Sequence, residues 1–314
     1  MKRVFCVGEL LIDWVCTEHG VSLAEGSRFE KKAGGAPANV AAAVARLGGE
    51  AVFMGRVGED PFGDFLVNTL RKERVDVSMI DRGGSTTFAF VSLKADGERD
   101  FVFCRGADGE YSLDRIDLSR LRSGDILHFG SATAWLPGEL RVTVFQLLSI
   151  ARDRGMFISF DPNHRDALIH DLESFRRDCL HFLEHARFVK MSEEEAMLVS
   201  GVKDPMVAVN VLMRHGPDVL CVTMGASGTL LATRERMELV PSVRVKQVDS
   251  TGAGDAFVGA MLYRFAGEER LEEALGHHGK LAEFVRFANR AGAAACTGYG
   301  AIASLPTLEQ VLSL

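Results

Sequence analysis

The stretch DSTGAGDAFVGAML, residues 249–262, places small residues and a second aspartate, Asp255, at the start of an apolar run that is compatible with a helix. Serine, threonine and aspartate are common at helix starts, and Gly252 and Gly254 permit backbone angles that point successive N–H groups the same way. That geometry binds anions. The alternative interpretation is an ordinary N-cap before a packed helix, which an isolated G-x-G would favour.

The composition indicates a globular protein with small partners. At 314 residues and 47% apolar content, the chain is long enough for one large α/β domain or two modest ones. Its formal charge of −7 comes from 43 acidic and 36 basic residues without a basic tract, which argues against a nucleic-acid or anionic-membrane partner. The N-terminal run is too short and acidic for a signal peptide, no segment has the length of a membrane span, and the six cysteines form no C-x-x-C pair. We therefore expect a cytoplasmic protein.

Short β-rich runs alternate with segments of helical periodicity. This alternation is typical of a mainly parallel central sheet with helices on both faces, here in a single α/β domain over residues 1–314. The predicted strands begin at Val4, Ala51, Ile126, Met156, Phe188 and Val219, and the predicted helices include residues 39–47, 140–154, 174–183 and 206–215.

One region departs from this alternation. Residues 86–104, TTFAFVSLKADGERDFVFC, read as two alternating strands around Ala95, Asp96 and Gly97, which is a hairpin signal. Residues 14–32 are also extended and rich in turns, so we expect them to join the hairpin in a small β-sheet lid inserted into the main domain.

The predicted hairpin has an apolar face. Phe88 and Phe90 alternate with Ser92 on its first strand, and Phe101 and Phe103 stand on the opposing strand. A two-stranded hairpin is marginally stable alone, so this face needs a cover. We expect the lid to close over a small-molecule site and to pair with the lid of a second copy in a homodimer. A surface hairpin packed on its own domain is the alternative.

Polar residues follow several predicted strands at their carboxyl ends. Asp13 follows the first strand, residues 161–165 (DPNHR) follow MFISF, Thr223 and Gly225 end VLCVTM, and residues 249–255 follow VRVKQV. In open α/β sheets the binding crevice lies beyond the carboxyl ends of the strands. We therefore expect these four strand ends to contribute to one site.

Two glycine motifs together resemble the paired signatures of the ribokinase-like (PfkB) family of carbohydrate kinases. They are GGAPANVAAAVARLG at 34–48 and DSTGAGDAF at 249–257, in the order and separation of the family. The similarity covers essentially the whole chain, through GE at 8–9, GRVGEDPFG at 55–63, DPNHR at 161–165, TMGASG at 223–228 and ANRAGAAACTGYGA at 288–301. The resemblance implies a ribokinase-like fold and phosphoryl transfer from ATP to a sugar.

The resemblance assigns the chemistry to the glycine-rich turn. By match, Gly252, Ala253 and Gly254 form an anion hole at the helix start, and Asp255 is the base that deprotonates the sugar hydroxyl. Phosphoryl transfer leaves little covalent work for the protein, so positioning and preorganised dipoles carry most of the catalysis. The chain contains no G-x-x-x-x-G-K-[ST] sequence, which agrees with a phosphate site made of backbone N–H groups.

Sugar contacts are implied near the N-terminus. By match, Gly34 and Gly35 let the backbone approach the sugar, Asn39 hydrogen-bonds a hydroxyl, and Asp13 accepts hydrogen bonds from two adjacent hydroxyls. Without the resemblance, AGGAPANVA would be a Gly-Gly turn before a helix and Asp13 a surface acid.

Three further residues, Asn163, Arg165 and Arg105, match sugar-contacting or substrate-pocket positions in the fructokinase-like and ketodeoxygluconate-kinase-like branches. For Arg105 the alternative is a surface arginine at the end of a hairpin. Asp161 is interpreted as a loop cap before a proline and is given no catalytic role.

The resemblance also implies contacts to the nucleotide and to a monovalent cation. Thr223, Gly225 and Gly228 match positions against the nucleotide phosphates and ribose, and Asn289 matches a position near the adenine. Asp249 and Thr251 match the monovalent-cation loop of potassium-activated members, together with backbone carbonyls near Ala291 and Gly300, so K⁺ is a further candidate cofactor.

One position departs from the family pattern. Where an N-x-x-E motif usually follows a strand, the sequence KMSEEEAMLVSG places Ser192 in the asparagine position and Glu195 in the glutamate position. The glutamate of the motif orders water around Mg²⁺ and the phosphates, and Mg²⁺ keeps several waters. Serine is the shorter ligand, so we expect an altered water network.

These motifs together predict an ATP-dependent, Mg²⁺-requiring sugar kinase that phosphorylates a primary hydroxyl, with fructose as the first-choice substrate. The segments HFGSATAWL and FDPNHRDAL favour the fructokinase branch. A 2-keto-3-deoxygluconate kinase is the nearest alternative, because Arg105 and Arg165 could pair with a sugar-acid carboxylate. A ribokinase or nucleoside kinase comes third. A catalytically silent sugar or nucleotide sensor on the same fold is the alternative from another class, favoured only by Ser192.

Overall fold

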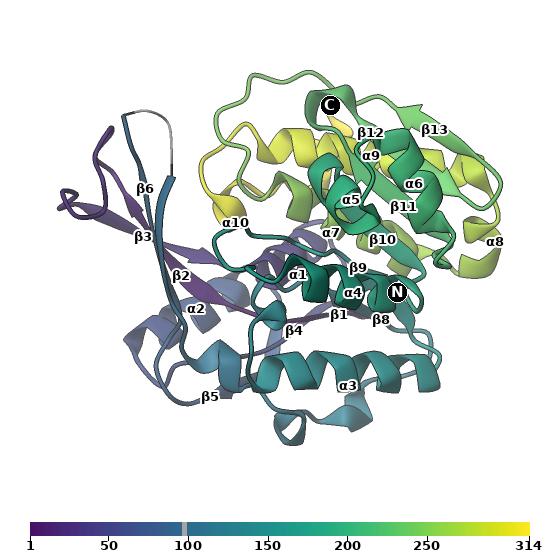
Figure 1. The fold of residues 1–314 in the computed structure, drawn as a ribbon. Coiled ribbons are helices and arrows are strands. Elements are labelled where there is room, and N and C mark those ends of the chain that lie inside the picture. Colours follow the sequence, from purple (N-terminus) through teal and green to yellow (C-terminus); the bar gives the residue numbers. More distant parts are fainter. Residues whose placement is uncertain (96–98) are drawn as a thin grey trace.

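The computed structural model describes residues 1–95 and 99–314, which form a large mixed sheet and a separate small one (Figure 1). Within the large sheet, neighbouring strands from β11 (Val219–Thr223) to β5 (Asp76–Arg82) pair in parallel, and two antiparallel strands extend it beyond β11. The spatial order is β13 (Met237–Val240), β12 (Thr229–Thr233), β11, β10 (Phe188–Ser192), β9 (Phe157–Phe160), β8 (Ile126–Phe129), β1 (Val4–Val7), β4 (Ala51–Val57) and β5. The predicted mainly parallel central sheet is confirmed.

Helices cover both faces of this sheet because successive side chains of a strand point to opposite faces. In β1, Val4 and Cys6 belong to one hydrophobic core, and Phe5 and Val7 belong to the other. The first core includes α1 (Ala36–Arg46), α2 (Pro61–Lys72), α7 (Ala253–Gly267), α8 (Leu271–Leu275), α9 (His278–Ala295), α10 (Ala301–Ser304) and α11 (Leu308–Leu312). The second includes α3 (Glu139–Asp153), α4 (Leu172–Leu183), α5 (Glu193–Ser200) and α6 (Pro205–Met213). Short 3-10 helices lie at Ala107–Glu110, Leu113–Arg115, Leu118–Arg120, Thr133–Trp135 and Gly225–Ser227.

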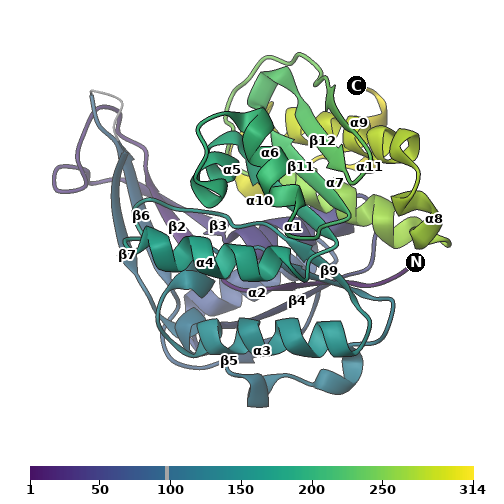
Figure 2. The same cartoon turned by 45° about the vertical axis from the view of Figure 1, so that its right-hand side comes forward.

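The small sheet projects from one side of the main body (Figures 1 and 2). Its strands, in spatial order, are β3 (Phe29–Gly34), β2 (Leu11–Cys16), β6 (Phe88–Leu93) and β7 (Arg99–Cys104). Strands β6 and β7 pair antiparallel, as expected for the hairpin, although the predicted turn residues Asp96 and Gly97 lie outside the described residues. The expected small β-sheet is therefore present.

The phenylalanines of the hairpin do not share one face, contrary to the sequence-based expectation. Phe90 pairs with Val102, whereas Phe101 pairs with Val91 and Phe103 with Ala89. Because partners across a pair point to the same side, Phe88 and Phe90 lie on one face and Phe101 and Phe103 lie on the other. Each face of the small sheet therefore carries its own aromatic residues.

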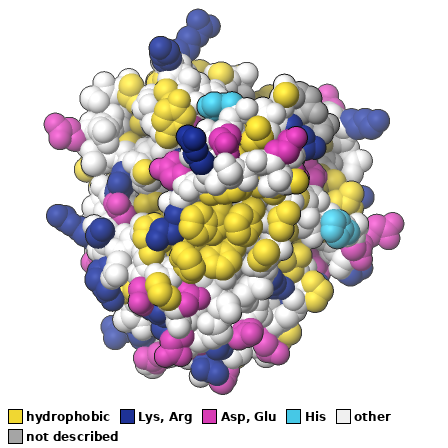
Figure 3. Space-filling view, turned by 90° about the vertical axis from the view of Figure 1, so that its left-hand side faces the viewer, with side chains coloured by type: hydrophobic (Ala, Val, Ile, Leu, Met, Phe, Trp, Pro, Cys, Tyr) yellow, Lys and Arg dark blue, Asp and Glu magenta, His cyan; other side chains and the backbone are white. Residues whose placement is uncertain are grey.

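The face with Phe88 and Phe90 also carries Trp14, which is the neighbour of Phe90 across β2 and β6. The rings of Trp14 and Phe90 are stacked, with centroids 6.4 Å apart, and Phe29 packs edge-on against Phe90. Figure 3 views the molecule from the side of the small sheet and shows hydrophobic side chains gathered in one patch. We call the side chains of Trp14, Phe29, Phe88, Phe90 and Val102 the outer aromatic face.

Two further features differ from the expectation. The segment VRVKQV, which alternates like a strand, is not part of either sheet, and the chain between β13 and α7 is irregular. The hairpin of β12 and β13 was not predicted.

Within the described part of the chain, no single helix is long and apolar enough to cross a membrane. In that part, only α5 and α6 together, a pair bent at their junction, have the length and composition that a span needs.

Candidate active site

The glycine-rich turn begins helix α7 in a conformation that requires glycine. Gly252 is the N-cap, with φ of 80° in the left-handed region, and a Cβ added there would lie 3.0 Å from the backbone of Ala301. Ala253 and Gly254 follow in the first turn, where the helix dipole favours negative charge. The N–H of Ala253 donates to the carbonyl of Ser250 over 3.2 Å, so one of the three predicted donors already has a partner. Asp255 stands in the same turn.

A second glycine of α7 brings this helix against α1. A Cβ added at Gly259 would lie 2.4 Å from the Cβ of Ala43, so only glycine allows the two helices to approach so closely. This approach places Asn39 of α1 beside Asp255 of α7, with 2.7 Å between Asn39 Nδ2 and Asp255 Oδ2. The two glycine motifs of the sequence are therefore joined at one point in space.

The carboxylate of Asp255 and the amide of Asn39 leave one buried acceptor free. Among the described residues, Asn39 Oδ1 has no hydrogen-bond partner, although it is shielded from solvent. Burial raises the pKa of Asp255, while the hydrogen bond from Asn39 and the charges of Arg165 and Lys190 act in the opposite direction. A carboxylate and an unpaired hydrogen-bond acceptor thus lie side by side.

Asp13 on β2 lies near the pair of Asn39 and Asp255. A Cβ added at Gly34 would lie 2.0 Å from Asp13 Oδ2, so glycine at position 34 makes room for this carboxylate. Gly35 has φ of 110° and approaches the carbonyl oxygen of Glu9, where a Cβ would be 2.4 Å away. Burial raises the pKa of Asp13 to about 6, against the lowering effect of Arg165 and Lys32.

The three other predicted substrate residues differ in their surroundings. Arg165 is exposed, and its charge influences both Asp13 and Asp255, which places it near these carboxylates. Arg105 donates to the carbonyls of Pro137 and Thr133 and lies 3.6 Å from Asp108. Its guanidinium is therefore occupied by the protein.

Asn163 has a role in the backbone of its loop. It is buried with φ of 48°, and its Nδ2 donates to the carbonyl of Gly130 over 2.7 Å. Asparagine is one of the residues that tolerates this left-handed conformation. The side chain thus fixes the loop after β9 against the end of β8.

A buried ion pair that the sequence analysis missed lies under the glycine-rich turn. Lys190 of β10 donates to Asp161, with 3.0 Å between Nζ and Oδ2, and both residues are buried. A Cβ added at Gly254 would lie 3.1 Å from Lys190 Nζ. Asp161 also has the loop-capping role that the sequence predicts, because its other oxygen accepts from the N–H of Asn163. The available signal was a lysine inside an otherwise apolar buried strand, FVKMS.

Ser192 and Glu195 form a capping box at the start of α5. Ser192 Oγ accepts from the N–H of Glu195 over 3.1 Å, and Glu195 Oε2 accepts from the N–H of Ser192 over 2.7 Å. The other oxygen, Oε1, accepts from the N–H of His164. Glu195 is a buried carboxylate in the first turn of α5, directly after β10, and such a hard oxygen donor suits Mg²⁺ through water.

The residues predicted for the nucleotide lie around the ends of β11 and β12. Thr223 ends β11 and donates to the carbonyl of Met191, and Gly225 has φ of 53° with open space around it. Gly228 has φ of 113°, and a Cβ there would lie 2.2 Å from the carbonyl of Val240.

Asn289 of α9 lies beside this region, but its amide is bound by the protein. Its Oδ1 accepts from Thr229 Oγ1, and its Nδ2 donates to the carbonyls of Val240 and Pro241. The side chain therefore holds the chain after β13 against α9.

The loop predicted for a monovalent cation is closed by Asp249. Its Oδ1 accepts from the N–H and hydroxyl of Thr251, and its Oδ2 accepts from the N–H of Gly300 over 3.0 Å. These hydrogen bonds keep the pKa of Asp249 below its usual value despite partial burial. The two segments predicted to form the loop are thus adjacent, and carboxylate and carbonyl oxygens are hard donors.

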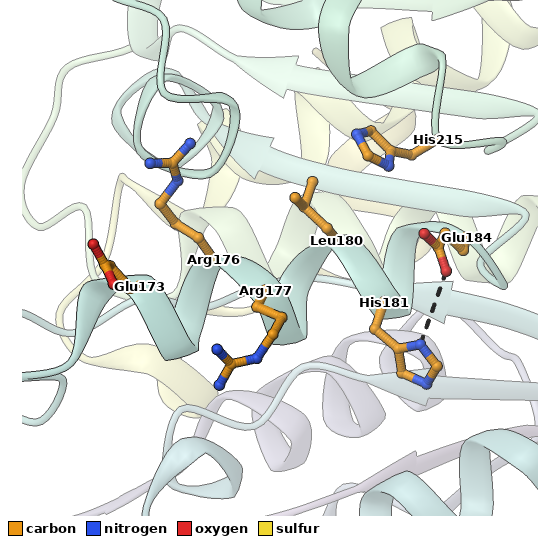
Figure 4. Close-up of a pocket in the computed structure, with 7 residues that line it drawn as sticks. All are labelled: Glu173, Arg176, Arg177, Leu180, His181, Glu184 and His215. Carbon is orange, nitrogen blue, oxygen red and sulfur yellow. Dashed lines mark ion pairs between the residues drawn. The ribbon is translucent and has the colours of Figure 1, made fainter.

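A separate cavity of about 570 Å³ lies along α4 (Figure 4) and contains none of the predicted site residues. Glu184 and His181 form an ion pair there, with 3.9 Å between Oε2 and Nδ1. The cavity is lined by Glu173, Arg176, Arg177, Leu180, His181, Glu184 and His215.

Known proteins resemble this chain over its whole length. The model of the pfkB family carbohydrate kinases matches residues 1–308. Fructokinase-1 of Zea mays is 42% identical over 320 residues, covering 100% of this chain and 97% of the relative.

Two solved structures share the fold of this chain at about one-third sequence identity. Fructokinase with bound ATP from Xylella fastidiosa has a TM-score of 0.88 at 33% identity, covering 99% of this chain and 97% of that one. A fructokinase double mutant from Vibrio cholerae O395, in a form bound to fructose, ADP and potassium ion, has a TM-score of 0.87 at 31% identity, covering 100% and 98%. With its ribokinase-like architecture and both glycine motifs meeting at Asp255, the chain belongs to the pfkB family of carbohydrate kinases.

Proposed function

We propose that this kinase transfers the γ-phosphoryl group of ATP to a primary hydroxyl of fructose. The observation that carries the proposal is the junction of Asp255 and Asn39 at the helix N-terminus, with the unpaired acceptor Asn39 Oδ1 beside the carboxylate. A sugar hydroxyl satisfies that acceptor by donating to it. The fructokinases among the similar proteins supply the choice of sugar.

In the proposed mechanism, Asp255 accepts the proton of the attacking hydroxyl. The hydroxyl oxygen then forms a bond to the γ-phosphorus, the bond between that phosphorus and the bridging oxygen breaks, and ADP leaves. The N–H groups of Gly252 and Gly254 stabilise the charge on the transferred group, and that of Ala253 joins them by exchanging the carbonyl of Ser250 for a phosphoryl oxygen. Asp13 accepts from two adjacent sugar hydroxyls, and Gly34 and Gly35 allow the sugar to approach the backbone.

ATP and the cations occupy the other side of the glycine-rich turn in this proposal. Thr223, Gly225 and Gly228 contact the phosphates and ribose, and Asn289 shapes the adenine site by holding the loop after β13. Glu195 would hold Mg²⁺ through water, and the bound ion would neutralise phosphate charge. The loop of Asp249 and Thr251 would hold K⁺, which would have a structural and electrostatic role there.

A 2-keto-3-deoxygluconate kinase is the second candidate, favoured by the exposed guanidinium of Arg165 near Asp13 and Asp255. Arg105 supports this candidate less, because Asp108 and two carbonyls already occupy its side chain. Loss of a hydrogen bond to a charged carboxylate costs about 1.5–3 kcal/mol. Arg165→Ala should therefore weaken a keto-acid substrate by that amount and fructose by clearly less.

An ADP-release assay with MgATP separates these candidates. We expect the highest kcat/KM with fructose among fructose, 2-keto-3-deoxygluconate, ribose and a nucleoside. Turnover of the keto acid without turnover of fructose would replace the first candidate with the second. Absence of turnover with every sugar would favour a catalytically silent sugar or nucleotide sensor. The only residue that favours a sensor is Ser192, and it caps a helix in this structure.

The small sheet is proposed to act as a lid and as a dimer contact in the cytoplasm. Its face with Phe101 and Phe103 also carries Asp13, through the pairing of Asp13 with Ala89 and of Ala89 with Phe103. That face covers the sugar and excludes water, which would otherwise accept the phosphoryl group. The outer aromatic face packs against the same face of a second copy. Saturating fructose should increase amide protection in β2 and β7, and unchanged protection would reject the lid.

A further inference from the structure

Lys190, the buried cation under the glycine-rich turn, has no role in the phosphoryl transfer proposed for Asp255. Lys190 stands in the middle of the parallel sheet, where a lysine is rarely buried without a partner or a function. Burial alone would lower the pKa of its ammonium, but the carboxylates of Asp161, Glu195 and Asp255 raise that pKa above its ordinary value. Lys190 is therefore a fixed positive charge at neutral pH.

The ammonium group has more hydrogen-bonding capacity than the protein uses. It carries three donors, and Asp161 is its only hydrogen-bond partner among residues 1–95 and 99–314. The group also lies directly beside the glycine-rich turn, since a Cβ at Gly254 would be 3.1 Å from Nζ and 3.7 Å from Cε. At this position only glycine leaves the space between the ammonium and the turn open.

We propose that Lys190 is a further catalytic residue, whose ammonium donates to the γ-phosphoryl group and completes the anion hole formed by the N–H groups of α7. Asp161 is its positioning residue. The inference rests on the proposed phosphoryl transfer, but it does not depend on which sugar accepts the group. Charge-assisted hydrogen bonds to phosphate oxygens are about twice as strong as neutral ones. The attraction between the ammonium and the phosphoryl oxygens increases as negative charge shifts during transfer. Lys190 itself transfers no proton.

Asp161 holds the ammonium in place from the neighbouring strand. Its carboxylate lies at the end of β9, next to β10 in the sheet, and its second oxygen is occupied by the N–H of Asn163. Both partners are thus fixed by sheet geometry. Burial raises the pKa of Asp161, and the ammonium of Lys190 acts in the opposite direction by stabilising the ionised carboxylate.

The test separates contact with the γ-phosphoryl group from general support of the fold. Binding of ADP and of AMP-PNP, an ATP analogue with a nitrogen bridge to the γ-phosphoryl group, is measured by calorimetry in the presence of Mg²⁺. Lys190→Gln should weaken AMP-PNP at least about tenfold, the loss expected for a charge-assisted hydrogen bond, and should change ADP affinity by less than twofold. The exposed Lys203 provides the matched control, and Lys203→Gln should change neither affinity.

A second variant guards against failure of the single variant to fold, since Lys190→Gln leaves Asp161 buried without its partner. Lys190→Met combined with Asp161→Leu removes both charges with similar volumes, and it should show the same split between AMP-PNP and ADP. Equal loss of both ligands, or loss of neither, in a folded variant would overturn the proposal. Because the binding assay contains no sugar, its result stands even when wild-type protein fails to phosphorylate fructose.

Discussion

At the scale of single residues, the proposed chemistry depends on a few carboxylates whose surroundings differ from water. Asp255 is held by Asn39 at the start of α7, and Asp13 is enclosed beside Gly34. The resemblance to the family allowed both to be predicted, because Asp255 directly follows the second glycine of the G-A-G turn and Asp13 matches a family position after the first strand. The pair of Lys190 and Asp161 was not predicted, because its partners meet only when β9 and β10 pair.

Replacing Asp255 by asparagine tests its role as the base. The shape of the side chain is retained, but an amide cannot accept the proton of the sugar hydroxyl. We expect kcat to fall by about 10²–10⁴-fold, the usual contribution of a general base, while the affinities for fructose and ADP stay near those of wild type. Steady-state kinetics and calorimetry measure the two effects. Near-normal turnover would show that another group takes the proton.

The pH dependence of sugar use tests Asp13. Its pKa is about 6 in the folded protein, so the carboxylate is ionised above pH 6 and gains a proton below it. Only the ionised form accepts from two hydroxyls, so kcat/KM for fructose should fall by up to tenfold per pH unit below about 6. Asp255, whose pKa is also raised, can only steepen this fall. A profile that stays flat down to pH 5, measured with saturating ATP, would contradict the assignment of Asp13.

At the scale of elements, close packing of α1 on α7 determines the geometry of the site. Gly259 is the contact point, and an added methyl group would collide with Ala43 at 2.4 Å. Gly259→Ala should destabilise the protein by about 1–3 kcal/mol through overpacking and should lower kcat by separating Asn39 from Asp255. Gly267 at the end of the same helix is the control, because a Cβ there meets only Met1 at 3.7 Å. Urea unfolding and kcat should change for Gly259→Ala alone, and equal behaviour of the two variants would refute the packing argument.

The elements also show where sequence patterns are insufficient. The core strands were predicted because buried apolar runs between helices have few other interpretations. Which side chains of the hairpin share a face could not be predicted, because a shift of the strand register by one residue moves every side chain of a strand to the opposite face. In the observed register Leu93 pairs with Arg99, so Phe90 lies opposite Val102 and not opposite Phe101. In the same way, VRVKQV has the alternation of a strand, but no neighbouring strand pairs with it.

At the scale of the whole molecule, the proposed dimer follows from the outer aromatic face. Val102 is 48% exposed, and Trp14 and Phe90 are only partly buried in one chain. Light scattering at micromolar concentration should give the mass of a dimer, and Phe90→Glu should give a monomer because it places a charge in the contact. Val142→Glu changes an exposed apolar residue on α3 and should leave the dimer intact. A monomeric wild type would reject the pairing.

In the proposed reaction, the site around Asp255 transfers the γ-phosphoryl group of ATP to fructose. The most direct measurement follows the label of [γ-³²P]ATP after incubation with Mg²⁺, fructose and the purified protein. We expect labelled fructose phosphate from wild-type protein and a loss of this product in Asp255→Asn. Label that stays in ATP, or that appears only as inorganic phosphate, would contradict it.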